Sequence, residues 1–301
     1  MRWIAIFLLA APVAWSDLVT DVRVAAAQGN LPLGDSLINN YRGQRGITPE
    51  MLEAMSWMAR GAYDHQQLDR ADSYAHETEA QVRTELKRRA LDSDPHLALA
   101  LGAAIEVEAQ VLSARSDRNG ALALLRKDLV TYGRTSIRAR IQKNINLLSL
   151  EGKPAPPLEE AEFLGGKPVP LSALQGKPVL LFFWAHWCGD CKAEEPLLAQ
   201  LRREYASRGL TIVAPTQRYG YAAGGEDATP QQELRYIEAV RQHFYVDMLD
   251  VPAPVSEQNF KLYGASTTPT IVLIDRHGIV RLYHPGAMRL DELRAAVKSV
   301  L

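Results

Sequence analysis

The chain has 301 residues, a length typical of two domains, and its 47% hydrophobic and 23% charged residues are ordinary for a globular protein. Its formal net charge is −1, and no long basic run interrupts the sequence. This charge pattern lacks the basic footprint of a nucleic-acid-binding protein, so no nucleic acid partner is expected.

The N-terminus has the pattern of a secretory signal peptide. Arg2 supplies a minimal positive region, Trp3 to Val13 form an apolar core, and Ala14-Trp15-Ser16 offers small residues for cleavage. We expect the signal to span residues 1–16, with cleavage after Ala27 as the alternative. The apolar run is shorter than the roughly 20 residues that span a bilayer, and a buried N-terminal helix is the competing interpretation. Export predicts a periplasmic or other extracytoplasmic protein, in a compartment where disulfides persist.

Residues 28–48 carry four glycines, three asparagines and one proline, and these helix breakers predict an extended lead-in over 17–48. Helical patterns then fill residues 49–151, so this part is expected to be all α. Thr48 and Pro49 start the first helix, and Asp94-Pro95 start the third. The expected helices run from Pro49, over 69–90, from Pro95, over 121–132 and over 135–150.

Two helix pairs in this half, near residues 57–75 and 101–122, faintly resemble tetratricopeptide hairpins. No third copy or constant period follows them, and stacked repeats need several copies to bury a core. A plain helical bundle explains the same pattern. Under either interpretation, the helical domain could carry a client protein.

A proline-rich boundary at Gly152 to Pro157 separates the helical domain from residues 152–301. The remainder alternates apolar strand and helix patterns, which predicts an α/β fold. A hairpin with a Gly-Gly turn is expected at 161–169. The expected strands are 179–184, 210–214, 270–275 and 279–284, and the expected helices are 188–207, 230–244 and 290–301.

The only two cysteines, Cys188 and Cys191, lie at the predicted junction of a buried strand and a helix. Unpaired N–H groups and the macrodipole at a helix N-terminus favour a thiolate, so Cys188 is the expected nucleophile. Cys191, one turn deeper, would resolve the mixed disulfide. Gly189 and Asp190 suit the tight entry into the helix. The spacing predicts a redox pair.

The two cysteines also have two structural interpretations, a zinc site and a structural disulfide. A zinc site needs four ligands, and no pair of histidines has the usual spacing to complete one, so no metal is expected. A purely structural disulfide over so small a ring would constrain the unfolded chain little. Nothing in the sequence indicates a bound cofactor.

The segment FFWAHWCGDCKAEEP resembles the active-site segment of the thioredoxin superfamily, and in particular its TlpA/ResA-like branch of extracytoplasmic thiol-disulfide oxidoreductases. Thr267-Thr268-Pro269-Thr270 is similar to the cis-proline loop of that superfamily. The resemblance implies a thioredoxin-like domain at 152–301, with a central mixed sheet flanked by helices. It also implies that Trp187, Thr268 and Pro269 shape a groove for an extended substrate chain.

The resemblance has one departure, which concerns the proton acceptor. Thioredoxin has a buried Asp six residues before its first active-site cysteine, where this chain has Phe182. The TlpA/ResA-like branch instead has a Glu at the position of Glu194. An i, i+3 spacing places Glu194 on the same helix face as Cys191, so it could accept the proton of the resolving thiol. The alternative is a solvated acid, like Glu195 beside it.

Two further residues could tune the cysteines. The negative charge of Asp190 should raise the pKa of Cys188, which favours a reductase that draws electrons from a membrane or soluble thiol donor. A cationic His186 would lower the same pKa, but a solvated surface histidine is the alternative. The long segment 218–227 could form a rim that touches substrate, or a disordered surface insertion.

The leading hypothesis is an exported thiol-disulfide oxidoreductase that uses the Cys-Gly-Asp-Cys pair to exchange disulfides with protein thiols. A helical client-binding or scaffold protein with a thioredoxin-like module is the alternative from another class. A peroxidase is the third hypothesis. Peroxiredoxins carry a Thr three residues before the reactive cysteine, however, and here that residue is Ala185.

Overall fold

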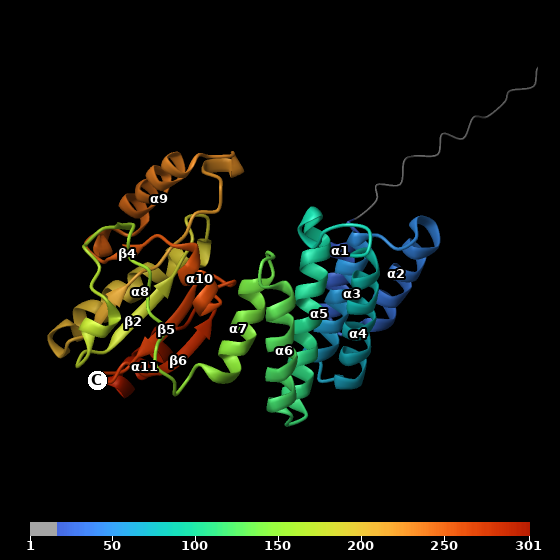
Figure 1. The fold of residues 1–301 in the computed structure, drawn as a ribbon, viewed down its shortest axis with the longest axis horizontal. Helices are drawn as coiled ribbons and strands as arrows, with labels where there is room; N and C mark the ends of the chain where they lie inside the picture. Colours follow the sequence, from blue (N-terminus) through green and yellow to red (C-terminus); the bar gives the residue numbers. More distant parts are fainter. Residues whose placement is uncertain (1–16) are drawn as a thin grey trace, which may run out of the picture. The chain divides into compact units, whose positions relative to one another are not determined.

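The computed structural model describes residues 17–301 (Figure 1). The expected signal peptide, residues 1–16, lies outside the described residues. The chain divides into two compact units, one ending at Val111 and the other running from Leu112 to Leu301. The helices α6 and α7 therefore group with the C-terminal unit, whereas the sequence placed the domain boundary at 152.

The first unit is helical from its first described turn. It contains α1 (Leu18–Ala27), α2 (Leu31–Arg45), α3 (Pro49–Asp64), α4 (Leu68–Glu85), the short 3₁₀ helix η1 (Leu91–Ser93) and most of α5 (Pro95–Ala114). Thr48 caps α3 as expected, because its Oγ1 accepts from Met51 N at 3.2 Å. The expected helices from Pro49, over 69–90 and from Pro95 are thus present as α3, α4 and α5.

The expected extended lead-in at 17–48 is wrong, because its supposed helix breakers act as helix starters. The side chain of Asn30 accepts from Leu33 N at 3.3 Å, and Pro32 lies in the first turn of α2. Gly34 allows close helix packing, since a Cβ there would lie 2.2 Å from Sδ of Met58. Asn30 and Pro32 thus start a helix and Gly34 allows close helix packing, although residues of these types are also common in extended segments.

Helix α1 is packed into this unit. Val22, Ala25 and Ala26 are buried, and a Cβ at Gly61 of α3 would lie 2.7 Å from Cβ of Ala26. Residues 18–27, which the alternative cleavage after Ala27 would remove, are therefore part of the packed helical unit.

Among the described residues, one helix, α5, is long and apolar enough to cross a membrane. However, 67% of its most apolar window is buried within the protein. Such burial is typical of the core helix of a globular unit.

The second unit begins with α6 (Arg118–Tyr132) and α7 (Arg138–Ser149). Helix α7 packs on α10 (Glu257–Tyr263). Asn146 Nδ2 donates to Leu262 O at 3.4 Å, and a Cβ at Gly264 would lie 2.3 Å from Lys143 N. The contact is close enough that α7 forms part of the C-terminal fold.

The centre of this unit is a four-stranded mixed sheet in the order β3-β2-β5-β6. Strand β2 (Val179–Phe183) pairs parallel with β3 (Thr211–Val213) and antiparallel with β5 (Thr270–Ile274), which pairs antiparallel with β6 (Val280–Pro285). The remaining helices are α8 (Gly189–Tyr205), α9 (Pro230–Phe244) and α11 (Leu290–Val300). Figure 1 shows this sheet among its helices. The predicted α/β thioredoxin-like fold is confirmed.

Both faces of the sheet are covered, as the apolar strands predict. Leu180 and Phe182 pack in one core with α8 and α11, whereas Leu181 and Phe183 pack in a second core with Phe260 and Tyr263 of α10. The alternation follows from the two-residue period of a strand.

The expected hairpin at 161–169 is wrong. Strand β1 (Phe163–Leu164) pairs antiparallel with the distant β4 (Ala253–Pro254). Gly165 turns the chain at φ +72° where a side chain would meet the carbonyl of Val251, so the Gly-Gly pair serves this crossing rather than a local turn.

Candidate active site

The two cysteines lie where the chain passes from β2 into α8. Cys188 is the N-cap of α8, and Cys191 N donates to Cys188 Sγ at 3.0 Å. The sulfurs are joined in a disulfide with an S–S distance of 2.05 Å. Both residues are buried, Cys191 completely and Cys188 with 3% exposed. The N–H group that points at Cys188 Sγ would stabilise this sulfur as a thiolate after reduction.

The sheet register brings the proline loop to the same edge. Phe183 at the end of β2 pairs with Thr270 at the start of β5, so the cysteine segment and Pro269 leave the sheet together. The peptide bond between Thr268 and Pro269 is cis. Trp187 is half exposed and lines a pocket of about 270 Å³ together with Thr268. The three predicted groove residues thus lie at one edge of the sheet.

Glu194 lies on α8, one turn beyond Cys191, and only 2% of it is exposed. Its Oε1 accepts from Met288 N at 3.0 Å, while its buried Oε2 has no hydrogen-bond partner within residues 17–301. Burial raises the pKa of Glu194 to about 7, and the charge of Asp190 adds to this rise. The solvated alternative for Glu194 is therefore wrong, and its carboxyl group can exchange a proton near neutral pH.

Glu195 is also buried, so the expectation that it is a solvated acid is wrong. Burial raises its pKa, and the charge of Asp247 adds to this rise. The hydroxyl of Tyr245 is buried, and this burial raises the pKa of Tyr245. The charges of Glu195 and Glu194 add to the rise. Two adjacent acids thus share the interior side of α8, one turn or more beyond the disulfide.

His186 is buried, so the alternative of a solvated surface histidine is wrong. Its Nε2 lies 3.2 Å from Oε1 of Glu233 on α9, and the ring is surrounded by the edges of Tyr219, Tyr221 and Tyr236 at 5.3–5.6 Å between centroids. Burial lowers its pKa despite the carboxylate of Glu233. A neutral His186 at pH 7 cannot act on Cys188 as a cation.

The segment 218–227 is folded against the site rather than disordered. Glu233 accepts from Tyr219 N at 2.5 Å and from Gly220 N at 2.9 Å, in addition to its contact with His186. The ring of Tyr219 lies 5.5 Å from that of Trp187. Glu233 therefore fixes both the residue before Trp187 and the loop beside it. No local pattern in the sequence marked Glu233 or Tyr236.

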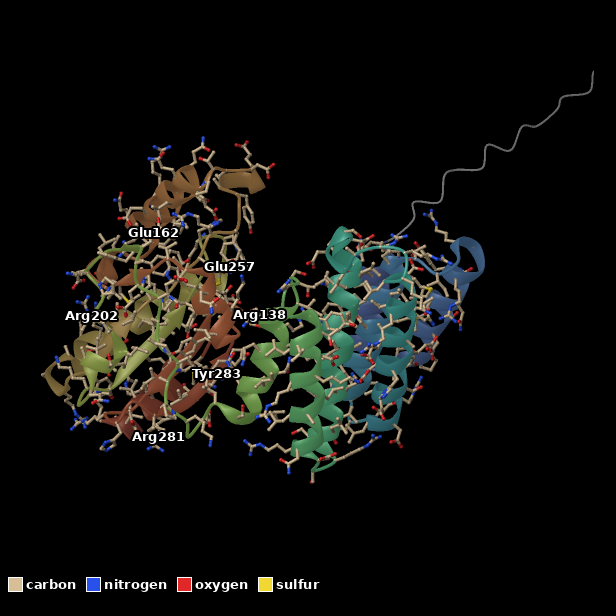
Figure 2. All side chains as sticks on the ribbon, viewed as in Figure 1. Arg138, Glu162, Arg202, Glu257, Arg281 and Tyr283 are labelled. Atoms are coloured by element: carbon tan, nitrogen blue, oxygen red, sulfur yellow. A yellow bond between two sulfur atoms is a disulfide. The ribbon has the colours of Figure 1, made fainter. Side chains whose placement is uncertain are left out.

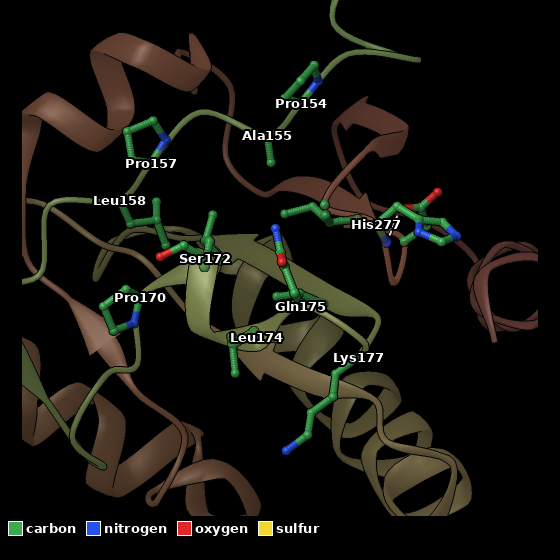
Figure 3. Close-up of a pocket in the computed structure, with 15 residues that line it drawn as sticks. Pro154, Ala155, Pro157, Leu158, Pro170, Ser172, Leu174, Gln175, Lys177 and His277 are labelled. Atoms are coloured by element: carbon green, nitrogen blue, oxygen red, sulfur yellow. Dashed lines mark hydrogen bonds between the residues drawn. The ribbon is translucent and has the colours of Figure 1, made fainter.

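A second well-formed pocket, of about 260 Å³, lies at the opposite end of the sheet (Figure 3). It is lined by Val179 at the start of β2, Ile274 at the end of β5, and the proline-rich segment around Pro157. Because the cysteines follow the other end of β2, this pocket has no part in their chemistry. Among residues 17–301, no cluster of three or more side chains could hold a metal ion.

Residues 150–300, half of the chain, match the family model described as Redoxin. The chain belongs to the redoxin family. The redoxin domain coincides with the sheet, the flanking helices and the disulfide described above, and it starts at the end of α7.

Curated relatives of the redoxin domain have consistent names. The thiol-disulfide oxidoreductase ResA of Oceanobacillus iheyensis is 33% identical over 136 residues, which cover 44% of this chain and 62% of that protein. The thiol:disulfide interchange protein DsbE of Pseudomonas fluorescens is 28% identical over 50% of this chain and 77% of that protein. The predicted resemblance to ResA-like proteins is thus confirmed. The chain spans less than two thirds of the length of this ResA relative.

Among solved structures, a thioredoxin-family thiol:disulfide interchange protein of Chlorobium tepidum is similar at 22% identity and a TM-score of 0.39, over 50% of this chain and 96% of that one.

Proposed function

We propose that this protein is an exported thiol-disulfide oxidoreductase that reduces disulfides in other proteins. The observation that carries the proposal is the Cys188–Cys191 pair at the N-terminus of α8, one turn from the buried carboxyl group of Glu194. The names of the relatives, thiol-disulfide oxidoreductase and thiol:disulfide interchange protein, support the same reaction class.

The reaction is a two-step transfer of two electrons. In the reduced protein, the Cys188 thiolate attacks one sulfur of the client disulfide, and the other client sulfur leaves as a thiolate that takes a proton. Cys191 then gives its proton to Glu194 and attacks Cys188 Sγ, which releases the second client thiolate. The client disulfide is reduced to two thiols, and the protein is left with the Cys188–Cys191 disulfide.

Groove residues would hold the client chain during this exchange. Trp187 offers an exposed ring, and the backbone N–H and C=O of Thr268 have no hydrogen-bond partner in the part of the chain that the structure describes. An extended client segment could pair with these groups as an added strand. Pro269 would place this backbone beside the sulfurs, with its own carbonyl held by Gly286 N at 2.8 Å.

The direction of exchange follows from charge. Asp190 lies exposed between the cysteines, and a negative charge there disfavours a second one on Cys188. A less stabilised thiolate makes the dithiol a better electron donor. The protein would be re-reduced by a thiol donor in the membrane or in the same extracytoplasmic compartment.

Trapping tests the proposal. A Cys191→Ala variant lacks the thiol that resolves the mixed disulfide. It should therefore accumulate a mixed disulfide between Cys188 and a client peptide that contains a disulfide. Cys188→Ala should trap none, although it keeps Cys191. Equal trapping by both variants, or by neither, would contradict the proposed roles.

A further inference from the structure

The pocket beside the disulfide has a wall that the redoxin domain does not supply. Trp187, Tyr219 and Thr268 line its 270 Å³ volume. Arg138 and Ala139, in the first turn of α7, and Thr135, just before that helix, line the same pocket. The residue that flanks the reactive cysteine thus shares a pocket with a helix that precedes the family domain.

This wall is firmly attached. Arg138 Nη1 donates to Lys261 O of α10 at 2.8 Å, and the tight contact of Gly264 with Lys143 fixes the same helix one turn further on. Figure 2 shows Arg138 and Glu257, which both line the pocket, projecting from α7 and α10. The pocket is therefore preformed rather than closed by a mobile segment.

The pocket carries an uncompensated positive charge. Two cationic side chains, Arg138 and Lys261, and one carboxylate, Glu257, line the pocket. Lys261 forms an ion pair with Glu257 at 2.8 Å. Arg138 has no ion-pair partner in residues 17–301, and only one of its guanidinium donors is bonded, to a neutral carbonyl. An Arg placed at the edge of a substrate groove with free donors is suited to bind a carboxylate in two-pronged geometry.

We propose that this pocket binds a side chain of the client segment next to its reactive cysteine, and that Arg138 selects clients with an acidic residue there. The proposal rests on the proposed function, because it concerns the substrate of the same disulfide. It places client recognition on α7, so a helix that precedes the family domain contributes to specificity while the cysteines perform the exchange.

The test compares three disulfide-containing peptides that differ only in one residue beside the cysteine, which is Glu, Gln or Lys. The rate constant for reduction by the reduced full-length protein is measured for each. Wild type should reduce the Glu peptide about tenfold faster than the Lys peptide, since a hydrogen bond between charged groups is worth about 1.5 kcal/mol. High salt should diminish the difference.

Variants separate the pocket from the general charge of the protein. Arg138→Gln keeps a donor for Lys261 O and should level the three rates, and Arg138→Glu should reverse their order. The matched control Arg134→Glu makes the same charge change at an exposed residue that does not line the pocket, and should keep the wild-type order. Ala139→Trp should fill the pocket and slow all three peptides. An unchanged denaturant unfolding midpoint reports an intact fold in each variant, and Arg134→Glu, which does not line the pocket, should also react normally with a small aromatic disulfide.

The outcomes distinguish the two proposals. If wild type reduces the peptides at equal rates, or if Arg134→Glu changes the order as much as Arg138→Glu, the role of Arg138 is overturned while the oxidoreductase proposal stands. If wild type reduces none of the peptides, the proposed function fails, and this inference fails with it.

Discussion

The backbone N–H of Met288 donates to Oε1 of Glu194 at 3.0 Å and leaves Oε2 of the same carboxyl group buried without a partner in the described chain. One oxygen is thus anchored by the loop that follows β6, and the other is available for a proton. With a pKa raised to about 7, the group is part ionised at neutral pH, as a general base for a thiol should be.

The first prediction concerns the resolving step. Glu194→Gln should slow the attack of Cys191 on a preformed mixed disulfide by about a hundredfold, the usual range for loss of a general base. In wild type, the rate should rise with pH through an apparent pKa near 7, and this inflection should be absent in the variant. Stopped-flow release of the client thiol measures both.

Glu195→Gln is the matched control for this experiment, because it removes an adjacent buried carboxyl group. It should leave the inflection near pH 7 in place. A control that abolishes the inflection while Glu194→Gln retains it would assign the proton transfer to the other acid.

The second prediction concerns stability. The pKa of Glu194 is about 7 in the folded protein against an ordinary 4.5, so the folded state binds more protons between these values. Its contribution to the free energy of unfolding is fully present below pH 4.5 and is lost as the pH rises through 7, by on the order of 3 kcal/mol. Glu194→Gln should flatten this decline, as measured by denaturant unfolding of the oxidised protein at pH 5 and pH 8.

Glu204→Gln serves as the control for the stability experiment. Arg294 lowers the pKa of this exposed carboxylate to about 2, so its titration falls below the window of pH 5 to 8. The slope of stability with pH should stay as in wild type. An unflattened slope in Glu194→Gln would mean that the carboxyl group is solvated in solution.

The third prediction concerns Glu233, which connects His186 to the loop beside the active site. Glu233→Ala would leave three polar partners unpaired, so it should lower the free energy of unfolding by about 3 kcal/mol. Hydrogen exchange at the amides of Tyr219 and Gly220 should become faster. The exposed neighbour Gln231, changed to Ala, should alter stability by less than about 0.5 kcal/mol. Unchanged exchange at both amides would disprove the anchoring role.

The fourth prediction concerns the packing of α7. Gly264 and Gly278 both have positive φ, at +60° and +77°, so either Gly→Ala change costs about 1 kcal/mol in conformation. Only Gly264→Ala would also push a Cβ to 2.3 Å from Lys143 N, whereas Gly278 has nothing within 4 Å. Gly264→Ala should therefore cost several kcal/mol more on denaturant unfolding. Equal costs would show that α7 is not tightly packed in solution.

Local sequence signals predicted how the residues of the candidate site are arranged. The Cys188 and Cys191 spacing, the proline loop and the i, i+3 relation of Glu194 to Cys191 are short-range patterns, and the structure places all of them at one edge of the sheet. Helix starts at Pro49 and Pro95 were also readable, because caps act within one turn.

Contacts between residues far apart in the chain could not be predicted from the sequence. Glu233 lies 47 residues from His186, and no pattern near either residue reveals that they meet. His186 was therefore assigned a surface alternative although three tyrosines enclose it. The lead-in at 17–48 was misinterpreted because Asn30, Pro32 and Gly34 have two uses, and only the packing of Gly34 against Met58 decides between a helix and an open chain.

The reduction potential of the Cys188–Cys191 couple tests the account most directly. It is measured by equilibrating the full-length protein with defined dithiothreitol or glutathione buffers, with Cys191→Ala as the control that has no couple. The account predicts a reversible two-electron couple near or below about −250 mV, in the range of reductants such as thioredoxin. A value near −120 mV, the strongly oxidising end, would contradict the direction inferred from Asp190, and the absence of any reversible couple would contradict the proposed function.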